Sequence, residues 1–518
     1  MELTDLKETR LNGTVGQFLE KFCRDNATKM QFPDVDYFVR QELVSIVESE
    51  FSKTDWDSSL AVPMISTFRT IARDEHNVDV LFTSENVKNY LLTWAKLPED
   101  PKHQVSTTEQ LEAIKCLVNA QFKSQEMRKS FGEPSHEALR NQLKALAGKT
   151  TFSPEETLSY NLLLRILFIS TALQVEMRPL WSQDNYFNVL NSILEQSMAL
   201  AMIGNEKSKK DLTTRVSEVL KTLYNLYCKT EPDSERTENI LKLSRKLLFS
   251  SFAEDEDCCQ NCVSLIFALP VVQSVICPKV QPGQKCLATF EDRDMSIMKI
   301  LLEKLEEKVD KKDEELLTVF VTSLLRYCVA SQQARRYVRL IVLPPLKGKD
   351  VERHPDEGDA LRNKLIRIMK SVGNAGMVAS ELMFVLCKKS VNRMIKYTGF
   401  GHSAGFMANA GLLGQINAPK SDEDSEDSET EEYAKVEDRI NPVTGCIRPE
   451  NMSNPFEGMS EEQKMYEAEQ LMNNLNKMLE SGVIKPATIG EDGKTRPLKH
   501  VLEMTKNIPD QPDDSDSE

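Results

Sequence analysis

Two arginines one helical turn apart are the residues in this chain whose spacing best suits ionic recognition. Arg69 and Arg73 stand at i and i+4 of a predicted helix, turned roughly 120° from its apolar stripe at 100° per residue. Like charges at this spacing cost about 0.2–0.5 kcal/mol unless an anion bridges them. The pattern therefore indicates an anion site, and two solvated arginines on an exposed face are the simpler alternative. The apolar stripe consists of Met64, Phe68, Ile71 and Ala72.

A second polar pair, Asn119 and Lys123, has the same i, i+4 spacing on a later helix. The pattern Ser-Thr-Thr-Glu over 106–109 is typical of a capping box, which predicts that this helix starts there. Asn119 and Lys123 flank its apolar side. Here too a plain solvated face is the alternative. The apolar side consists of Leu111, Ile114, Leu117, Val118 and Phe122.

Residues for covalent, metal or phosphate chemistry do not form a convincing pattern elsewhere. Cys258, Cys259 and Cys262 invite a zinc interpretation, but no histidine lies nearby and 262–269 resembles a buried helix. Residues 490–495 (Gly-Glu-Asp-Gly-Lys-Thr) have two residues between the glycines where a phosphate-binding loop needs four, and we expect no strand before them. The six histidines lie in no catalytic motif. We expect no metal, no cofactor and no enzyme activity.

Composition points to an intracellular protein that binds other proteins. The N-terminus has no basic and apolar signal segment, and no run of about 18 apolar residues occurs, so we expect no membrane span. The formal charge is −15, and residues 421–438 hold ten acidic residues against Lys435. The rest of the chain is near balance and offers no strongly basic face, so we expect no nucleic-acid partner.

The chain is predicted to be all-α. Few glycines and many Leu, Lys, Glu and Met residues favour helix, and no strand alternation or hairpin turn is evident. Helices recurring about every forty residues suit an armadillo/HEAT-like α-solenoid superhelix over 1–415, and a compact all-helical protein is the alternative. Ser153-Pro154 marks one helix start. Apolar stripes predict further helices over 158–173, 186–202, 216–227, 240–252, 298–305 and 316–329.

Beyond residue 415 the character of the chain changes. Gly399 and Gly401 are predicted to end an amphipathic helix that runs from about Met383 to Ile395. Residues 421–432 hold eight carboxylates and four hydroxyls, so they should be disordered. We expect a flexible acidic linker over 416–459, an amphipathic C-terminal helix over 460–485 and a disordered tail over 486–518. The apolar face of that helix consists of Met465, Ala468, Leu471, Met472, Leu475, Met478 and Leu479.

Several motifs, in one order, resemble the synembryn family ("resistance to inhibitors of cholinesterase"). The family consists of cytosolic chaperones and exchange factors for the α subunits (Gα) of heterotrimeric G proteins. The resemblance is close from about 330 to 485 and patchier before. A generic armadillo-type scaffold or transport adaptor is the alternative; importin-like adaptors show regularly spaced Trp and Asn, and this chain has only Trp56, Trp94 and Trp181. The motifs lie at 336–346, 361–367, 384–387, 396–401, 441–445 and 454–459.

The resemblance implies a function and a role for the polar pairs. It implies a groove that grips the C-terminal helix of Gα, with Arg69 and Arg73 suited to the terminal carboxylate and the Asn119 amide to the last peptide groups. Lys123, the fourth expected contact, stands where relatives often show Asn. We expect a monomer that binds GDP-bound or nucleotide-free Gα without βγ, in the cytoplasm and, through Gα, at the cell cortex. Which Gα class it prefers, and whether the 460–480 helix contacts Gα or the solenoid, stay open.

The acidic stretch also predicts regulation by an acid-directed kinase of the casein kinase 2 type. Such kinases require an acidic residue three places after the hydroxyl, which Ser421 and Ser428 have; Ser425 gains one when Ser428 is phosphorylated. Each phosphate adds roughly −1.5 to −2 charge. Where the family shows basic residues, Arg335 and Arg336 are the expected docking residues, and an acidic solubilising linker is the alternative. Weaker docking candidates are Arg339, Arg362 and Arg367.

Overall fold

The computed structural model describes residues 2–51, 58–98, 104–203, 206–230, 232–311, 314–371, 373–416, 430–448, 459–480, 487–489 and 495–497. The chain divides into two compact units, Met1–Val275 and Ile276–Glu518, which we call unit 1 and unit 2. Both are mostly helical, as the sequence predicts, and the described strands are two or three residues long.

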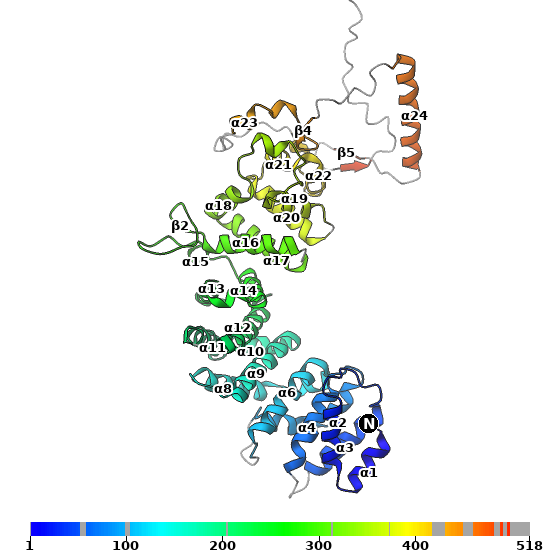
Figure 1. The fold of residues 1–518 in the computed structure, drawn as a ribbon, viewed down its shortest axis with the longest axis vertical. Helices are drawn as coiled ribbons and strands as arrows, with labels where there is room; N and C mark the ends of the chain where they lie inside the picture. Colours follow the sequence, from blue (N-terminus) through cyan, green and yellow to red (C-terminus); the bar gives the residue numbers. More distant parts are fainter. Residues whose placement is uncertain are drawn as a thin grey trace, which may run out of the picture. The chain divides into compact units, whose positions relative to one another are not determined.

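Helices of unit 1 follow one another in chain order (Figure 1, blue to green). Short 3₁₀ helices, labelled η, lie between some of them. The bounds are α1 Leu3–Leu11, α2 Val15–Asp25, α3 Tyr37–Phe51, η1 Ser58–Leu60, α4 Ala61–Ile71, η2 Val78–Phe82, α5 Glu85–Trp94, α6 Thr107–Lys123, α7 Gln125–Ser130, α8 Glu133–Ala147, α9 Pro154–Leu173, η3 Val175–Met177, α10 Arg178–Trp181, α11 Asp184–Ile203, α12 Glu206–Tyr227, α13 Ser234–Leu248, η4 Ser251–Glu254 and α14 Glu256–Ala268; α15 Gln273–Ile276 ends at the boundary.

Unit 2 is built around α20, which packs against α17, α18, α19, α21 and α22. The bounds are β1 Thr289–Phe290, β2 Arg293–Asp294, α16 Ser296–Lys311, α17 Glu314–Ala330, α18 Gln332–Val342, η5 Gly348–Val351, α19 Leu361–Met369, α20 Asn374–Leu386, α21 Val391–Thr398, α22 Phe400–Asn409, η6 Leu413–Gln415, α23 Glu431–Ala434, η8 Glu437–Arg439, β3 Ile440–Asn441, β4 Cys446–Ile447, α24 Glu461–Glu480, β5 Ala487–Ile489 and β6 Thr495–Pro497.

The two helix starts that the sequence predicts are confirmed. Ser106 accepts from the Glu109 amide at 3.3 Å, and the Glu109 carboxylate accepts from the Ser106 amide at 2.7 Å. Ser153 and Glu156 form the same reciprocal pair, with Pro154 at the first helical position. Each box satisfies two amides that a helix N-terminus leaves unpaired.

Helices of unit 1 are joined by side-chain bonds between residues about fifty positions apart. α4, α6, α9, α12 and α14 pack in succession. The Asn119 amide donates to the Arg69 carbonyl, 50 residues away, at 2.9 Å. Gln142 of α8 and Gln196 of α11 donate to the carbonyls of Ala95 and Leu146, separated from them by 47 and 50 residues. These bonds satisfy carbonyls at helix ends, and similar bonds recur along unit 1 between residues separated by 47 to 50 positions.

A recurring arginine also closes the ends of three helices. Arg128, Arg178 and Arg335 each donate to the carbonyl seven residues before them, at 2.8, 2.7 and 2.9 Å. The preceding residues are similar: Ser-Gln-Glu-Met over 124–127, Gln-Val-Glu-Met over 174–177 and Ser-Gln-Gln-Ala over 331–334. This motif is a repeat signature, and it lies at the start of α7, of η3 and α10, and of α18 rather than in the long apolar stripes.

The helix predicted from Met383 to Ile395 is wrong, because it is two helices. α20 ends at Leu386, and Lys388 and Lys389 adopt left-handed backbone (φ 56° and 57°) before α21 begins. Gly399, with φ 74°, ends α21 as predicted, but Gly401 lies inside α22. The stripe predicted over 240–252 is also interrupted, because α13 ends at Leu248.

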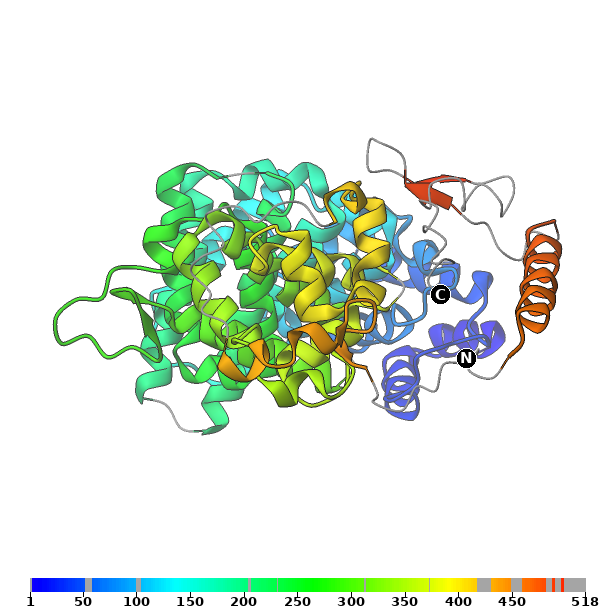
Figure 2. The same cartoon turned by 90° about the horizontal axis from the view of Figure 1, so that it is seen from above.

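Short hairpins occur where the sequence predicts no strand pairing. Within the described ranges β1 pairs with β2, β3 with β4 and β5 with β6, all antiparallel. The β1–β2 turn uses Glu291 and Asp292, both left-handed (φ 47° and 57°), in place of the usual Asn-Gly. Figures 1 and 2 show this hairpin projecting from the helices of unit 2.

Residues 430–448, which we call the strap, are folded onto unit 2, although they fall within the expected flexible linker. Thr430 caps α23 by accepting from the Tyr433 amide at 3.2 Å, and its hydroxyl donates to the Leu346 carbonyl. Tyr433 is buried against Leu346 and Val351. Thr430, Glu431 and Glu432 therefore lie at the start of a helix rather than in a disordered stretch.

The motif at 441–445, in the strap, is bonded through its backbone to the motif at 396–401. The Phe400 amide donates to the Pro442 carbonyl at 2.8 Å, and the Gly401 amide donates to the Val443 carbonyl at 2.9 Å. These are first-turn amides of α22, which no helical carbonyl can reach. Gly399 and Gly445 both have positive φ and approach so closely that a Cβ on Gly445 would lie 3.1 Å from the Gly399 Cα.

The helix predicted near 460–480 is confirmed as α24, Glu461–Glu480. Its Met465, Tyr466 and Leu471 are exposed. In the described parts of the chain, no single helix is long and apolar enough to cross a bilayer. A bent combination of α9 with 175–181 reaches that threshold only by length and composition, and α9 has many buried apolar side chains.

We predict that Gly445→Ala releases the strap. Its new methyl would lie 2.6 Å from Pro355 Cγ, and positive φ alone costs alanine about 1–2 kcal/mol. Limited proteolysis should cut within 430–448 faster than in the wild type. Gly405→Ala is the matched control, because that glycine lies inside α22 with nothing within 4 Å; alanine there should stabilise by about 0.5–1 kcal/mol. Equal cleavage of both variants would contradict the prediction.

Candidate functional site

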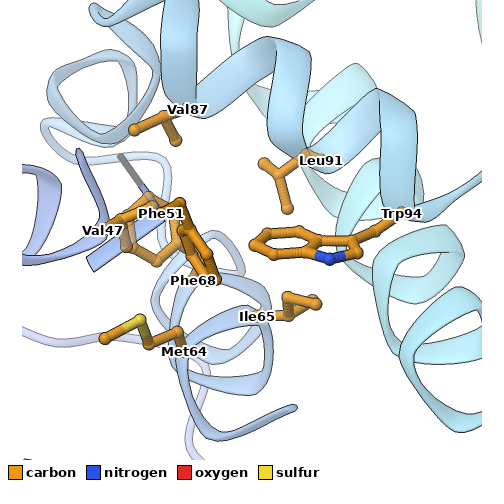
Figure 3. A pocket seen from close by; sticks show the side chains of 8 residues that line it. All are labelled: Val47, Phe51, Met64, Ile65, Phe68, Val87, Leu91 and Trp94. Atoms are coloured by element: carbon orange, nitrogen blue, oxygen red, sulfur yellow. The ribbon is translucent and has the colours of Figure 1, made fainter. Parts of the chain in front are cut away.

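The α4 helix is held by a compact apolar core on one face. Figure 3 shows side chains of α3, α4 and α5 converging. Between them lies a void of about 10 Å³, close to the size of one water and without polar lining. Phe51 and Trp94 meet edge to face with ring centroids 4.3 Å apart. This void is a packing feature that fixes α4, and it leaves Arg69 on another face. It is lined by Val47, Phe51, Met64, Ile65, Phe68, Val87, Leu91 and Trp94.

Arg69 is already ion-paired within the chain. Its Nε lies 3.0 Å from Glu112 Oε2 on α6, and about a quarter of the side chain is exposed. Lys115 also contacts Glu112, at 2.7 Å. One carboxylate therefore holds two cations at the α4–α6 contact. A ligand carboxylate would compete with Glu112 for Arg69.

Arg73 closes the end of another helix. Its NH1 donates to the carbonyls of Ala27 at 2.8 Å and Lys29 at 3.2 Å, just beyond α2. Burial and then the neighbouring Arg69 lower the pKa of Arg73. Arg73 therefore has a role in the fold besides any role in binding.

Asn119 and Lys123 lie on the neighbouring helix, α6, beside these arginines. Asn119 donates to the Arg69 carbonyl, and Lys123 pairs at 2.8 Å with Glu75, just after α4. The structure thus brings the four predicted residues together on α4, α6 and the turn after α4. Each one makes an internal bond, and the pair of Lys123 with Glu75 lies at the surface, which fits both a binding surface and a plain solvated face.

A second cluster repeats this arrangement and was missed by sequence reasoning. Residues 112–123 and 218–229 share the pattern Glu-x₂-Lys-x₃-Asn-x₃-Lys. Glu218 pairs with Arg165 of α9 at 3.0 Å, and with Lys221 at 2.8 Å, as Glu112 does with Arg69 and Lys115. Asn225 donates to the Phe168 carbonyl of α9 at 3.3 Å. The signal was present in the sequence as four matching polar residues within a window of twelve, with mostly different residues between them.

The predicted phosphate-docking residues differ in availability. Arg335 closes α17 through the Cys328 carbonyl, in the repeated position described above. Arg336 pairs with Glu291 of the β1–β2 hairpin at 2.6 Å and is 37% exposed. Arg367 donates to the carbonyls of Asp356 and Gly358, and Arg362 is buried. The predicted phosphorylation sites Ser421, Ser425 and Ser428 lie outside the described residues.

The structure also bears on the zinc interpretation of Cys258, Cys259 and Cys262 and on the segment 490–495, which has some features of a phosphate-binding loop. Burial raises the pKa of Cys258 to about 12, and it also raises the pKa of Cys262 well above the usual range of a thiol. Both shifts oppose the thiolate that zinc needs. Across the described ranges no three metal-ligating side chains gather. A strand, β5, does precede Gly490, contrary to expectation. It pairs antiparallel with β6, Thr495–Pro497.

Comparison with known proteins extends the resemblance to the synembryn family over nearly the whole chain. A model of the Ric8 family, described as "guanine nucleotide exchange factor synembryn", matches residues 64–494. The chain is 33% identical to the chaperone ric-8 of Caenorhabditis elegans, over 86% of this chain and 87% of that protein. It is 30% identical to the chaperone Ric-8A of Gallus gallus (100% and 99% covered) and of Xenopus tropicalis (97% and 96%). The chain therefore belongs to the Ric8, or synembryn, family.

Proposed function

We propose that this protein is a chaperone and guanine nucleotide exchange factor for G-protein α subunits, acting by non-covalent binding. The observation that carries the proposal is the gathering of Arg69, Arg73, Asn119 and Lys123 on the α4–α6 pair. These residues come from stretches some fifty positions apart, and they offer cations and an amide to a polypeptide end. The descriptions of the family and its relatives, exchange factor and chaperone, support it.

The mechanism follows from differential binding. The C-terminal helix of Gα packs on its own sheet and supports the loops around the guanine base. A surface that binds this helix only when it is displaced lowers GDP affinity by the difference in binding free energy between the two states. The same contact holds nucleotide-free Gα until GTP arrives. No side chain of this protein touches the nucleotide.

We further propose that the helices form an armadillo/HEAT-like solenoid over 1–415. The bonds between residues about fifty apart, and the arginine motif at 128, 178 and 335, support a repeating unit. In such an array each repeat contacts mainly its neighbours, which gives an extended surface for a partner helix. We place the protein in the cytoplasm as a monomer, reaching the cell cortex through Gα.

The first functional prediction concerns Arg69 and Arg73. Arg69→Ala/Arg73→Ala should slow the protein-stimulated release of GDP from purified Gα by roughly tenfold or more, because charge-assisted bonds to the carboxylate are lost. Glu112→Gln should not impair release, because it frees Arg69 from its competitor. Release is measured with a fluorescent GDP analogue.

The repeated cluster provides the matched control. Arg165→Ala removes an ion pair of the same 3.0 Å length from α9. It should leave GDP release near the wild-type rate. If Arg165→Ala and Arg69→Ala/Arg73→Ala lose equal activity, the α4–α6 surface is not the specific site. If the wild type itself does not accelerate release, the scaffold alternative gains.

The second functional prediction concerns α24. Its Met465 and Leu471 are exposed, and methionine suits contact with a surface that changes shape. Truncation after Gly458 should weaken binding to whole Gα but not to an isolated Gα C-terminal peptide, measured by calorimetry. Gln470→Ala, which changes a polar residue of the same helix, is the control. Loss of both affinities would indicate a structural role instead.

The third functional prediction concerns phosphorylation of Ser421 and Ser428. We propose that the phosphates dock on Arg336, whose partner Glu291 they would displace, more than on Arg335, which closes α17. In vitro phosphorylation should raise Gα affinity by about tenfold, the size of one or two new charge-assisted bonds. Ser421→Ala/Ser428→Ala and Arg336→Glu should each abolish the increase.

The control is reversal of an exposed cation in unit 1. Lys242 pairs with Glu238 at 2.7 Å, so Lys242→Glu reverses a comparable charge. It should keep the phosphorylation effect. An effect that survives Arg336→Glu would disprove this docking, and no effect in the wild type would favour the solubilising linker.

A further inference from the structure

Unit 1 contains a cavity of about 270 Å³ between α11, α12 and the turn before α9. Its lining is mixed: four large apolar side chains, two threonine hydroxyls, one carboxylate and one guanidinium. Ile203, at the end of α11, is 82% exposed, so the cavity meets solvent there. The lining residues are Thr150, Phe152, Thr157, Leu200, Ile203, Asp211, Leu212 and Arg215.

Arg215 is buried in the wall of this cavity without an ionic partner in the described parts of the chain. The residue is 1% exposed, and its Nε and NH1 have no hydrogen-bond acceptor there. Its guanidinium stacks on the Tyr160 ring, 4.0 Å from the centroid, and lies 5.1 Å from that of Phe152. Burial lowers the pKa of Arg215, because desolvation penalises the charged form. Stacking stabilises a cation but supplies no acceptors for its N–H groups.

Buried Arg40 of unit 1 differs from Arg215 in having a carboxylate at ion-pair distance. Its NH1 and NH2 also lack hydrogen-bond acceptors, but its Nε donates to the Val35 carbonyl at 3.0 Å and Asp74 lies 3.9 Å away. A second cavity, between α6, α8 and α9, contains Lys149, but this lysine pairs with Glu156 at 2.6 Å. Arg215 thus combines a cavity with unsatisfied donors, an arrangement that normally costs several kcal/mol for a buried charge.

The local charges favour one kind of ligand. Lys209 and Lys210 lie near the start of α12, where the helix dipole favours anions over cations. Asp211 also lines the cavity; burial lowers the pKa of Arg215, whereas the Asp211 carboxylate raises it and so offsets part of the cation's charge. This carboxylate would repel a dianion such as phosphate more strongly than a monoanion. Leu200, Ile203 and Leu212 offer apolar surface for a hydrocarbon body.

We propose that this cavity binds a small monocarboxylate with an apolar body, whose carboxylate is held by Arg215 and the hydroxyls of Thr150 and Thr157. The ligand is a free small molecule or a carboxylate-bearing side chain with an apolar neighbour. The site is separate from the α4–α6 surface, and its test uses no Gα.

Calorimetric titration of the full chain with hexanoate tests the proposal. Hexanoate should bind saturably, and hexanamide, which has the same shape without the charge, should bind roughly tenfold or more weakly. Phosphate should bind less well than hexanoate. Arg215→Met should lose hexanoate binding, and Asp211→Asn should strengthen it and admit phosphate. A short acetylated peptide ending in Leu-Asp, compared with hexanoate, distinguishes a side-chain ligand from a free one.

Stability of Arg215→Met gives an independent readout. If Arg215 lacks a partner, this variant should unfold at or above the wild-type temperature, because an unpaired buried charge is removed. Arg40→Met should unfold at a lower temperature, because it leaves the Asp74 carboxylate without its ionic partner. Equal binding of hexanoate and hexanamide, or hexanoate binding unchanged in Arg215→Met, would overturn the proposal. So would a marked fall in the unfolding temperature of Arg215→Met.

Discussion

The need to satisfy carbonyl groups at helix ends governs how this chain is assembled. Each α-helix leaves its last four carbonyls without an internal partner. Here side chains from the following segment or a neighbouring helix supply the donors, as Arg128, Arg178 and Arg335 do for the helices before them. Gln142 and Gln196 do so between α5, α8 and α11. Each helix end thus fixes the direction of the next segment, and a helix array is built from local bonds.

The same requirement shapes the candidate binding surface. Arg73 donates hydrogen bonds to carbonyls beyond α2, and Asn119 donates one to a carbonyl of α4. Arg69 and Lys123 are held by Glu112 and Glu75. A partner would therefore exchange one set of bonds for another rather than fill vacant positions. Such exchange makes the net free energy small compared with the individual contacts, and it favours partners whose groups match the geometry of the displaced carboxylates.

Local signals in the sequence predicted helix starts better than helix ends. The capping boxes at Ser106 and Ser153 depend on residues three apart, so they could be identified without the fold. The break after Leu386 could not, because the apolar pattern continues across Lys388 and Lys389, and lysine does not favour left-handed backbone. The turn at Glu291 and Asp292 could not be predicted either, because these residues also adopt left-handed backbone without being the glycine or asparagine that usually indicates it. The arginine motif at 128, 178 and 335 was missed because it lies at the starts of short helices, outside the long apolar stripes from which the helices were predicted. The partners of Arg69 and Arg73, which are Glu112 and the carbonyls beyond α2, come from tertiary contacts, and the spacing of residues in the sequence does not reveal them.

The strap has a consequence for the helices that precede it. The Thr430 hydroxyl donates to the carbonyl of Leu346, 84 positions earlier, so this one bond closes a loop that contains α19, α20, α21 and α22. Each doubling of loop length adds only about 0.6 kcal/mol to the entropic cost of closure, so the large separation in sequence is a small obstacle to this contact. The bond thus joins the two ends of the segment of unit 2 that holds these four helices.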